Sequence, residues 1–337
     1  FFYTIFTGCN HFAYHAPYPY YEKWTDPDYK GPNKYQVHFD PNEFVSNPSW
    51  DRPYTSYTDK EKQHIIDLYD GCVSRFDECV GRILETLKQQ ELMDNTIILI
   101  TSDHGEDLFE PNTTITHGVS FNGGDQGNLV PCILYVPGME PKKIDQIVRN
   151  IDISPTLLEL TEHPNENRFE GVSLMPCIEN DQRSLDLSFY GETGFPFIQR
   201  TIPGENVLKV PSMDQLTYVD KDFDFHIVLK EMYRDSIITG KERCLRTEEW
   251  KLVFTPGAEG PIHRLYHIPS DPNCTKDVSN ENPEILERMK YHLWQWIISG
   301  KESRGNEIFE GEIPEKYEIP SKFQNIEFSI DNEDHST

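Results

Sequence analysis

The sequence predicts an α/β protein in which helices flank a mostly parallel sheet, with a smaller antiparallel subdomain towards the carboxyl end. Two observations lead to this prediction. A long helical pattern over residues 59–90 runs directly into a short apolar stretch at 96–101, which is the helix-then-strand order of α/β folds. Later, strand-like stretches at 243–254 and 264–268 follow one another before a single helical pattern at 283–298, which is typical of an antiparallel sheet beside one helix.

Length and charge limit the classes of function. The 337 residues suffice for one large α/β domain and a smaller appendage. The net charge of −26 argues against nucleic acid or an anionic membrane as partner, because both bind basic surfaces. No apolar run approaches the roughly 18 residues of a membrane span. An anionic substrate would need a local positive centre, which a bound cation could supply.

The amino-terminal region is expected to be a strand followed by loops. Residues 1–6 are apolar and β-branched or aromatic, like the middle of a core strand, so we expect the sequence to be the carboxyl-terminal part of a longer protein. His11 and His15 follow where this strand would end, in a loop made irregular by prolines. Residues 20–58 lack periodicity and predict a long, ordered excursion that covers a site.

The helix expected at 59–90 has apolar residues at steps of three and four, with Asp59 as its expected N-cap. The next stretch, 96–101, is unbroken, apolar and β-branched, which predicts a strand buried on both faces of a parallel sheet.

That strand stops at a group of polar residues that we take as the first candidate site. Asp103 and His104 can ligate one cation together, and Gly105 would let the backbone turn sharply so that both reach it. Ligands of α/β proteins bind beyond the carboxyl ends of such strands. The alternative is an ordinary turn after a strand.

The remaining elements follow in order. Residues 109–129 are expected to be a loop around His117, and residues 195–240 show no classifiable pattern. The further expected elements are a strand at 130–136, a helix at 152–160 capped by Ser154 or Asp152, and a strand at 185–190.

Taken together, these segments resemble the sulfatase family of the alkaline-phosphatase superfamily. The similar segments are Ser102–Glu106 (Ser-Asp-His-Gly-Glu), the helix residues Tyr69, Asp77, Gly81 and Arg82, the loop His15–Tyr18 (His-x-Pro-Tyr), Val130–Pro131 with Val136–Gly138, Asp152–Leu157 (Asp-Ile-x-Pro-Thr-Leu), Gly171–Leu174 and Leu265–Pro272. The resemblance implies an alkaline-phosphatase-like fold. It divides the chain into the carboxyl-side part of a catalytic domain at 1–195, an α+β subdomain at 196–300 and an acidic, loosely ordered tail at 301–337.

The resemblance also implies an active site. A divalent cation, usually Ca²⁺, would be held by two carboxylates from an amino-terminal segment and by Asp103 with His104. His15 would be the catalytic loop histidine that touches the ester oxygen or protonates the leaving group. His11, which falls outside the His-x-Pro-Tyr pattern, would be a substrate-binding residue.

Two departures from the family pattern matter. The family's nucleophile motif, Cys/Ser-x-Pro-Ser-Arg, is not found; Ser46–Trp50 imitates it with tryptophan in place of arginine. We therefore expect the nucleophile on a missing amino-terminal segment, and no turnover by these 337 residues alone. There is also no lysine between Glu106 and Val130. His117 stands there instead, and this His-Gly is similar to that of phosphoethanolamine and phosphoglycerol transferases. His117 is therefore the second catalytic candidate, as a contact of the substrate oxyanion. The alternative is a plain loop histidine.

Three functions remain open. The first is a sulfuric ester hydrolase acting on a small anionic ester such as a sulfated sugar or an aryl sulfate. The second keeps the fold but acts on phosphate esters, as a phosphodiesterase or phospho-group transferase with Zn²⁺ or Mn²⁺. The third is a non-catalytic carbohydrate-binding or interaction protein derived from the fold.

Overall fold

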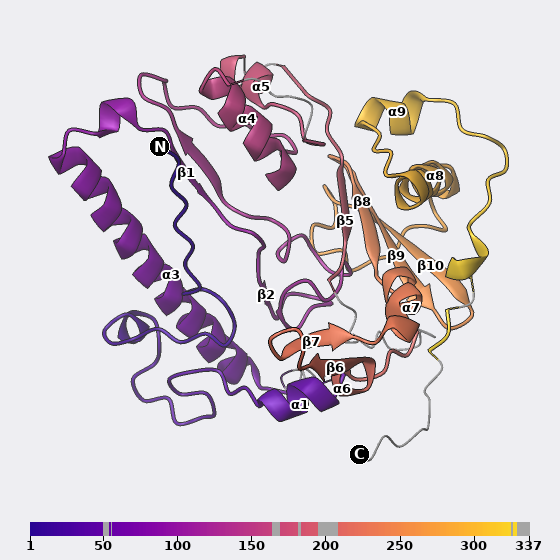
Figure 1. The fold of residues 1–337 in the computed structure, drawn as a ribbon, viewed down its shortest axis with the longest axis horizontal. Helices are drawn as coiled ribbons and strands as arrows, with labels where there is room; N and C mark the ends of the chain where they lie inside the picture. Colours follow the sequence, from indigo (N-terminus) through magenta and orange to yellow (C-terminus); the bar gives the residue numbers. More distant parts are fainter. Residues whose placement is uncertain are drawn as a thin grey trace. The chain divides into compact units, whose positions relative to one another are not determined.

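A computed structural model describes residues 1–49, 54, 56–163, 169–180, 183–194, 208–324 and 326–328 (Figure 1). Trp50 of the imitation motif and residues 195–207 lie outside these ranges. Contacts group the chain into two compact units. Unit 1 comprises residues 1–117 and 126–139, and unit 2 comprises residues 118–125 and 140–337. The domain boundary expected at residue 195 stays a prediction.

Unit 1 is built on a long helix, α3 (Asp59–Gln89). The helix begins at the expected residue, but its N-cap is Thr58 and not Asp59. Thr58 has extended backbone angles, so its hydroxyl accepts from the Glu61 N–H while the Glu61 carboxylate accepts from the Thr58 N–H. The buried face of α3 carries His64, Ile65 and Leu68.

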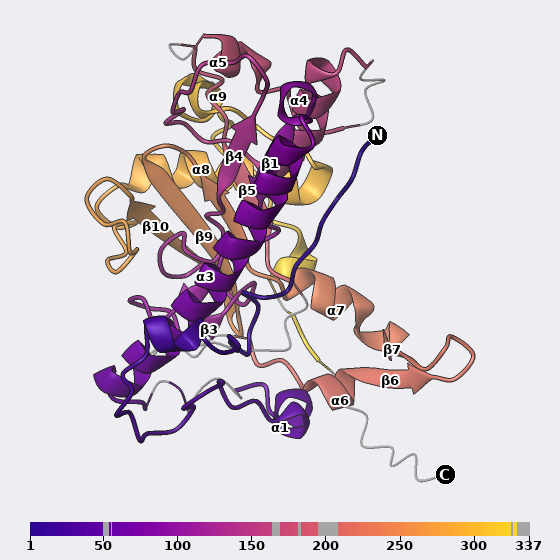
Figure 2. The same cartoon turned by 90° about the vertical axis from the view of Figure 1, so that its left-hand side faces the viewer.

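The segment before α3 gathers around the amino-terminal half of that helix (Figure 2). The 3-10 helix η1 (Tyr21–Lys23) packs on α3, and a short helix, α1 (Pro41–Ser46), is capped by Asp40. Tyr29 stacks on His64 of α3 with ring centroids 3.6 Å apart. The expected order of this excursion therefore comes from buried aromatic rings, although its only regular elements among the described residues are short.

Residues 1–8 differ from the expected core strand. They pair with no strand in the described part of the chain, and Phe1, Phe2 and Phe6 are exposed. Their apolar character reflects a strand-like composition without a strand partner.

The two strands expected next are β1 (Ile98–Thr101) and β4 (Cys132–Tyr135), with η2 (Met93–Asn95) leading into β1. They pair with each other in an antiparallel ladder, Ile98 opposite Tyr135 and Thr101 opposite Cys132. Parallel pairing needs a crossover, usually a helix, but the described chain between these strands contains only loops and a small hairpin, so it returns in the opposite direction. Burial on both faces is also not observed: β1 is half-buried and Ile133 of β4 is 59% exposed.

The small hairpin lies between β1 and β4. It consists of β2 (Asp107–Leu108) and β3 (Ile115–Thr116), which pair antiparallel. Ile115 is fully buried, and this fixes the hairpin in unit 1. His104 precedes β2 and His117 follows β3, so the hairpin brings the two histidines to the same end.

Unit 2 contains a four-stranded antiparallel sheet in the order β10-β9-β8-β5. The strands are β5 (Phe189–Glu192), β8 (Arg243–Arg246), β9 (Trp250–Gly257) and β10 (Gly260–His267). Helix α8 (Pro283–Ser299) packs on β8 and β9 (Figure 1). Leu252, Phe254 and Leu265 of the sheet meet Met289 and Trp294 of α8 in one buried cluster. The expected antiparallel subdomain with one helix is confirmed.

The tail differs from the loosely ordered segment that we expected. It forms α9 (Gly305–Glu310) and η5 (Ser321–Phe323), and Ile308 and Phe323 are buried in the cluster under α8. The other elements of unit 2 are η3 (Asn150–Asp152), α4 (Ile153–Leu160), α5 (Met175–Glu179), α6 (Met213–Leu216), β6 (Thr217–Asp220), β7 (His226–Leu229), η4 (Glu231–Tyr233) and α7 (Arg234–Thr239). Asp152 occupies the N-cap position of α4, without a side-chain cap bond. Among the described residues, no helix combines the length and apolar character needed to cross a bilayer.

Candidate active site

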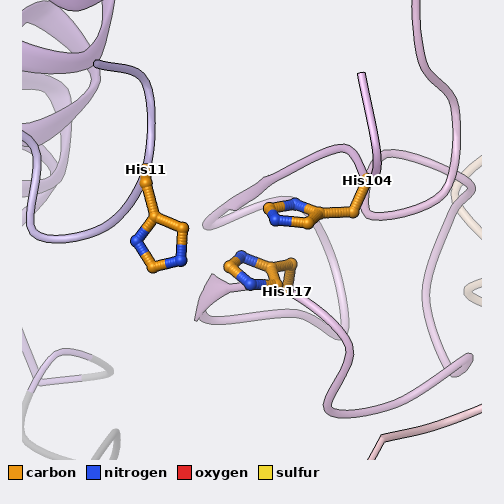
Figure 3. Close-up of side chains that lie close together, drawn as sticks. All are labelled: His11, His104 and His117. Carbon is orange, nitrogen blue, oxygen red and sulfur yellow. The ribbon is translucent and has the colours of Figure 1, made fainter. Parts of the chain in front are cut away.

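Three loops of unit 1 bring three histidines together. His11 comes from the loop before η1, His104 from the end of β1, and His117 from the end of β3 (Figure 3). One ring nitrogen of each lies within 4.8 Å of one ring nitrogen of the other two. The rings of His104 and His117 are stacked with centroids 3.5 Å apart, and the edge of His11 approaches both, at 6.0 and 5.1 Å. Residues separated by more than a hundred positions thus share one site.

The Nδ1 atom of each ring has an oxygen partner. In His11 it contacts the backbone oxygen of Phe12, and in His104 it lies 2.7 Å from the backbone oxygen of Gly105. In His117 it lies 3.2 Å from a carboxylate oxygen of Glu106. Because these oxygens only accept hydrogen bonds, each Nδ1 carries a proton, and the lone pair of a neutral ring is on Nε2.

Glu106 is a site residue that our sequence analysis named only as part of a motif. Its side chain is 4% exposed, directly before β2 and beside the ring of His117. Two tyrosines lie near it, Tyr14 buried and Tyr69 half-buried: burial and the Glu106 charge raise the pKa of Tyr14 well above its usual value, and the same two causes raise the pKa of Tyr69. A carboxylate in such a position fixes the orientation and the tautomer of its histidine.

Asp103 lies at the exposed edge of the site. Its carboxylate Oδ2 is 3.7 Å from Nε2 of His104, and its side chain is 58% exposed. Partial burial would raise its pKa, but the neighbouring His104 and hydrogen bonds from the His104 N–H and the Ser102 hydroxyl lower it below the usual value. Asp103 is therefore ionised at neutral pH and can act as a cation ligand.

Gly105 is required for a different reason from the one we expected. A Cβ atom there would lie 1.9 Å from the backbone oxygen of Gln126, and the Gly105 N–H donates to the Gly127 oxygen at 3.1 Å. The glycine allows two backbone segments to pack closely, and this packing holds His104 next to the 126–127 loop.

Residues 1–163 match the Sulfatase family model. This part of the chain is a sulfatase-family domain. Arylsulfatase K from Bos taurus is 24% identical over 277 residues, covering 80% of this chain and 44% of the relative. A sulfatase from Formosa agariphila is 33% identical over 150 residues, covering 41% of this chain and 29% of the relative. The chain thus spans less than half the length of these curated relatives.

Comparison with solved structures bears on the fold alone. The solved phosphonate monoester hydrolase SpPMH from Silicibacter pomeroyi superimposes with a TM-score of 0.56 at 20% identity, covering 86% of this chain and 55% of that structure. The predicted alkaline-phosphatase-like fold class is confirmed.

Within the sulfatase domain, the two candidate loop histidines occupy different positions. His15 is exposed and is not part of the three-histidine group. The loop contains the pattern His-x-x-Tyr twice, at His11–Tyr14 and at His15–Tyr18. Tyr14 is fully buried whereas Tyr18 is 71% exposed, so the first copy is anchored. This repeat was the signal that could have directed the sequence analysis to His11; the role expected for His15 stays a prediction.

Sulfatases in general depend on a divalent cation. Of the donors in this site, Asp103 offers oxygen, whereas His11, His104 and His117 offer nitrogen. Ca²⁺ prefers six to eight oxygen ligands. The described donor set therefore fits calcium only in part, through the carboxylate of Asp103.

Proposed function

We propose that this chain contributes to the active site of a sulfuric ester hydrolase that uses a divalent cation. The observation that supports this proposal most directly is the convergence of His11, His104 and His117 from three loops, next to the ionised Asp103, in a sulfatase-family domain. Asp103 and His104 would hold the cation. Such a cation neutralises negative charge on the oxygens of the ester group.

His117 would bind the ester oxygens. Its Nδ1 lies 3.2 Å from the buried carboxylate of Glu106, so Nε2 is the atom that would face the substrate. A proton on Nε2 of His117 would be donated to an oxyanion of the ester, at the place where many sulfatases have a lysine. Because Glu106 fixes the ring, the donor is positioned before the substrate arrives.

His11 would protonate the leaving oxygen. Its ring approaches both other histidines and is exposed, so it can reach a substrate that enters from solvent. The same role for His15 stays the alternative prediction. The nucleophile would come from a segment outside these residues, and the substrate would be a sulfated sugar or an aryl sulfate.

Hydrolysis of phosphate or phosphonate esters is the second candidate. One observation favours it: a histidine, His117, stands where many sulfatases have lysine, and the fold also superimposes on a phosphonate monoester hydrolase. A non-catalytic binding protein is the outcome if neither class of ester is turned over.

The experiment compares two esters of the same phenol with the full-length protein. We expect 4-nitrophenyl sulfate to be hydrolysed faster than 4-nitrophenyl phenylphosphonate. Removing the negative charge beside His117 by Glu106→Gln, which also replaces one acceptor oxygen with an NH2 donor, should lower kcat about 10-fold to 100-fold, as is usual for residues that orient a site histidine. His163→Ala, which removes an exposed histidine in unit 2, is the matched control and should leave turnover unchanged.

Faster turnover of the phosphonate would favour the second candidate. Equal activity of the Glu106→Gln variant and the wild type would contradict the role given to His117.

A further inference from the structure

We propose that His11, His104 and His117 form a three-imidazole binding site for a zinc-class transition-metal ion. This assignment differs from the cation site that the sulfatase resemblance implies, in which an oxygen-rich pocket holds Ca²⁺ through Asp103 and His104. It rests on the donors that converge in unit 1 and on the partners that each ring already has.

The hydrogen bonds of the three rings leave the same atom available in each. Every Nδ1 faces an oxygen acceptor: the Phe12 oxygen, the Gly105 oxygen, or the Glu106 carboxylate. Within the described part of the chain, no hydrogen bond uses Nε2 of any of these rings; Asp103 Oδ2, 3.7 Å from Nε2 of His104, is beyond hydrogen-bond distance. The three imidazoles therefore present lone pairs to one space.

Converging lone pairs need a positive centre. In the neutral rings each Nε2 is an acceptor, so no Nε2 can donate a hydrogen bond to another. The rings of His104 and His117 are nevertheless stacked, with their centroids 3.5 Å apart. A metal ion that accepts all three lone pairs resolves this arrangement. Glu106 adds the second feature of such sites, because a carboxylate that holds Nδ1–H fixes the tautomer and the orientation of the ring, with Nε2 left to bind the ion.

The distances suit a tetrahedral ion. Zinc–nitrogen bonds of about 2.0–2.1 Å place ligand nitrogens roughly 3.4 Å apart in a tetrahedron. The three ring nitrogens here lie within 4.8 Å of one another, so movements of about an ångström close the site. His11 is exposed and can make this movement, and Asp103, beside His104, is placed to be the fourth ligand.

The donor chemistry selects the class of ion. Three imidazoles with one carboxylate suit Zn²⁺ and its neighbours in the transition series, whereas Ca²⁺ requires oxygen ligands. The inference rests on the proposed function only in one respect: His11 and His117 are the residues that would contact the ester. If both proposals hold, zinc competes with the ester and inhibits hydrolysis.

Metal binding can be measured without any assay of activity. Untagged full-length protein is freed of metal with a chelator and titrated with Zn²⁺ against a chromophoric chelator, and separately with Ca²⁺ by calorimetry. We expect one zinc ion bound at the histidines. Each of His11→Ala, His104→Ala and His117→Ala should weaken zinc binding more than about 100-fold, and Glu106→Gln about 10-fold, with calcium binding changed less by His11→Ala and His117→Ala.

His15→Ala is the matched control, since it removes an exposed histidine from the same loop, four residues from His11. It should bind zinc like the wild type. Because His11 is also exposed, His11→Ala is not expected to unfold the protein, and thermal unfolding of each variant checks this. Zinc affinity that is unchanged in both His11→Ala and His117→Ala would overturn the inference, whatever the hydrolase assays show. Loss of hydrolysis with intact zinc binding would contradict only the proposed function.

Discussion

Two clusters of polar side chains in this protein differ in whether their hydrogen-bond acceptors are paired with donors. In unit 2, Glu242 accepts hydrogen bonds from the Ser120 hydroxyl, the Phe121 N–H and the Asn122 side chain, at 2.7–2.8 Å. Lys251 in the same unit donates to the Gly123 and Gly124 oxygens and to Asp125, at 2.9–3.0 Å. In unit 1, three histidines direct the same type of acceptor atom at one another.

The difference separates structural from functional polar groups. A buried charge with matched donors and acceptors stabilises the fold, and its removal leaves partners unsatisfied. A group of like acceptors in partly exposed loops adds little to stability but is suited to bind a cation. Four substitutions test this contrast through the free energy of unfolding in urea.

The largest effect is expected for Lys251→Met. The Lys251 side chain is 1% exposed, and its loss leaves Asp125 and two backbone oxygens without their buried donor. Because Asp125 is still 29% exposed, we expect a loss at the lower end of the usual range, about 3 kcal/mol. Lys276→Met removes an exposed ion pair with Glu281 and should change stability by less than about 0.5 kcal/mol. Similar losses in both variants would remove the contrast.

Gly105→Ala should cost about 2 kcal/mol, because the added methyl group meets the Gln126 backbone oxygen and forces the two segments apart. The matched control is Gly81→Ala on the exposed face of α3, where a Cβ meets nothing within 4 Å. That substitution should stabilise the helix by up to about 1 kcal/mol. A neutral Gly105→Ala would mean that the close packing beside His104 is dispensable.

A half-buried histidine of unit 2, His263, should make stability depend on pH. Burial lowers the pKa of His263 to about 3, and its Nε2 accepts from the Trp294 indole N–H. Below pH 6.5 the unfolded chain takes up a proton that the folded ring does not. The free energy of unfolding therefore decreases as the pH is lowered, by about 1.4 kcal/mol at pH 5.5. His263→Gln should remove this part of the loss between pH 7.5 and 5.5, and exposed His163→Gln should not. An unchanged pH dependence in His263→Gln would contradict the assignment.

The smallest effect is expected for His11→Ala. The ring is exposed and its hydrogen bond to Phe12 is local, so stability should change by less than about 0.5 kcal/mol. A loss above about 1 kcal/mol would place His11 with the structural residues of unit 2 and sharpen the boundary between the two kinds of cluster.

The sequence patterns predicted the elements whose signals are local. Helix α3 and the β9–β10 ladder follow from periodicity and strand-forming residues, and they were found within a few residues of the expected bounds. The parallel arrangement expected for the strand at 96–101 is wrong for its pairing with β4, because the direction of β4 depends on the path of the chain between the strands and not on the composition of either strand.

The candidate site was predicted only in part, because some of its residues have a local sequence signal and others are placed by the tertiary fold. Asp103, His104 and His117 stand out by motif and position. The contribution of His11 depends on which of two His-x-x-Tyr repeats has the buried tyrosine, and that of Glu106 on the fold of the β2–β3 hairpin. Both depend on tertiary structure, which a short stretch of sequence does not determine.

The path of the chain after His117 has a consequence for dissecting the protein. Residues 118–125 belong to unit 2, although the chain on both sides of them belongs to unit 1. A truncated protein ending near residue 139 would keep residues 118–125 but lose Glu242 and Lys251, the side chains that hydrogen-bond to them. Expression of the histidine-bearing region therefore calls for co-production of the carboxyl-terminal sheet, as a split protein or an intact polypeptide.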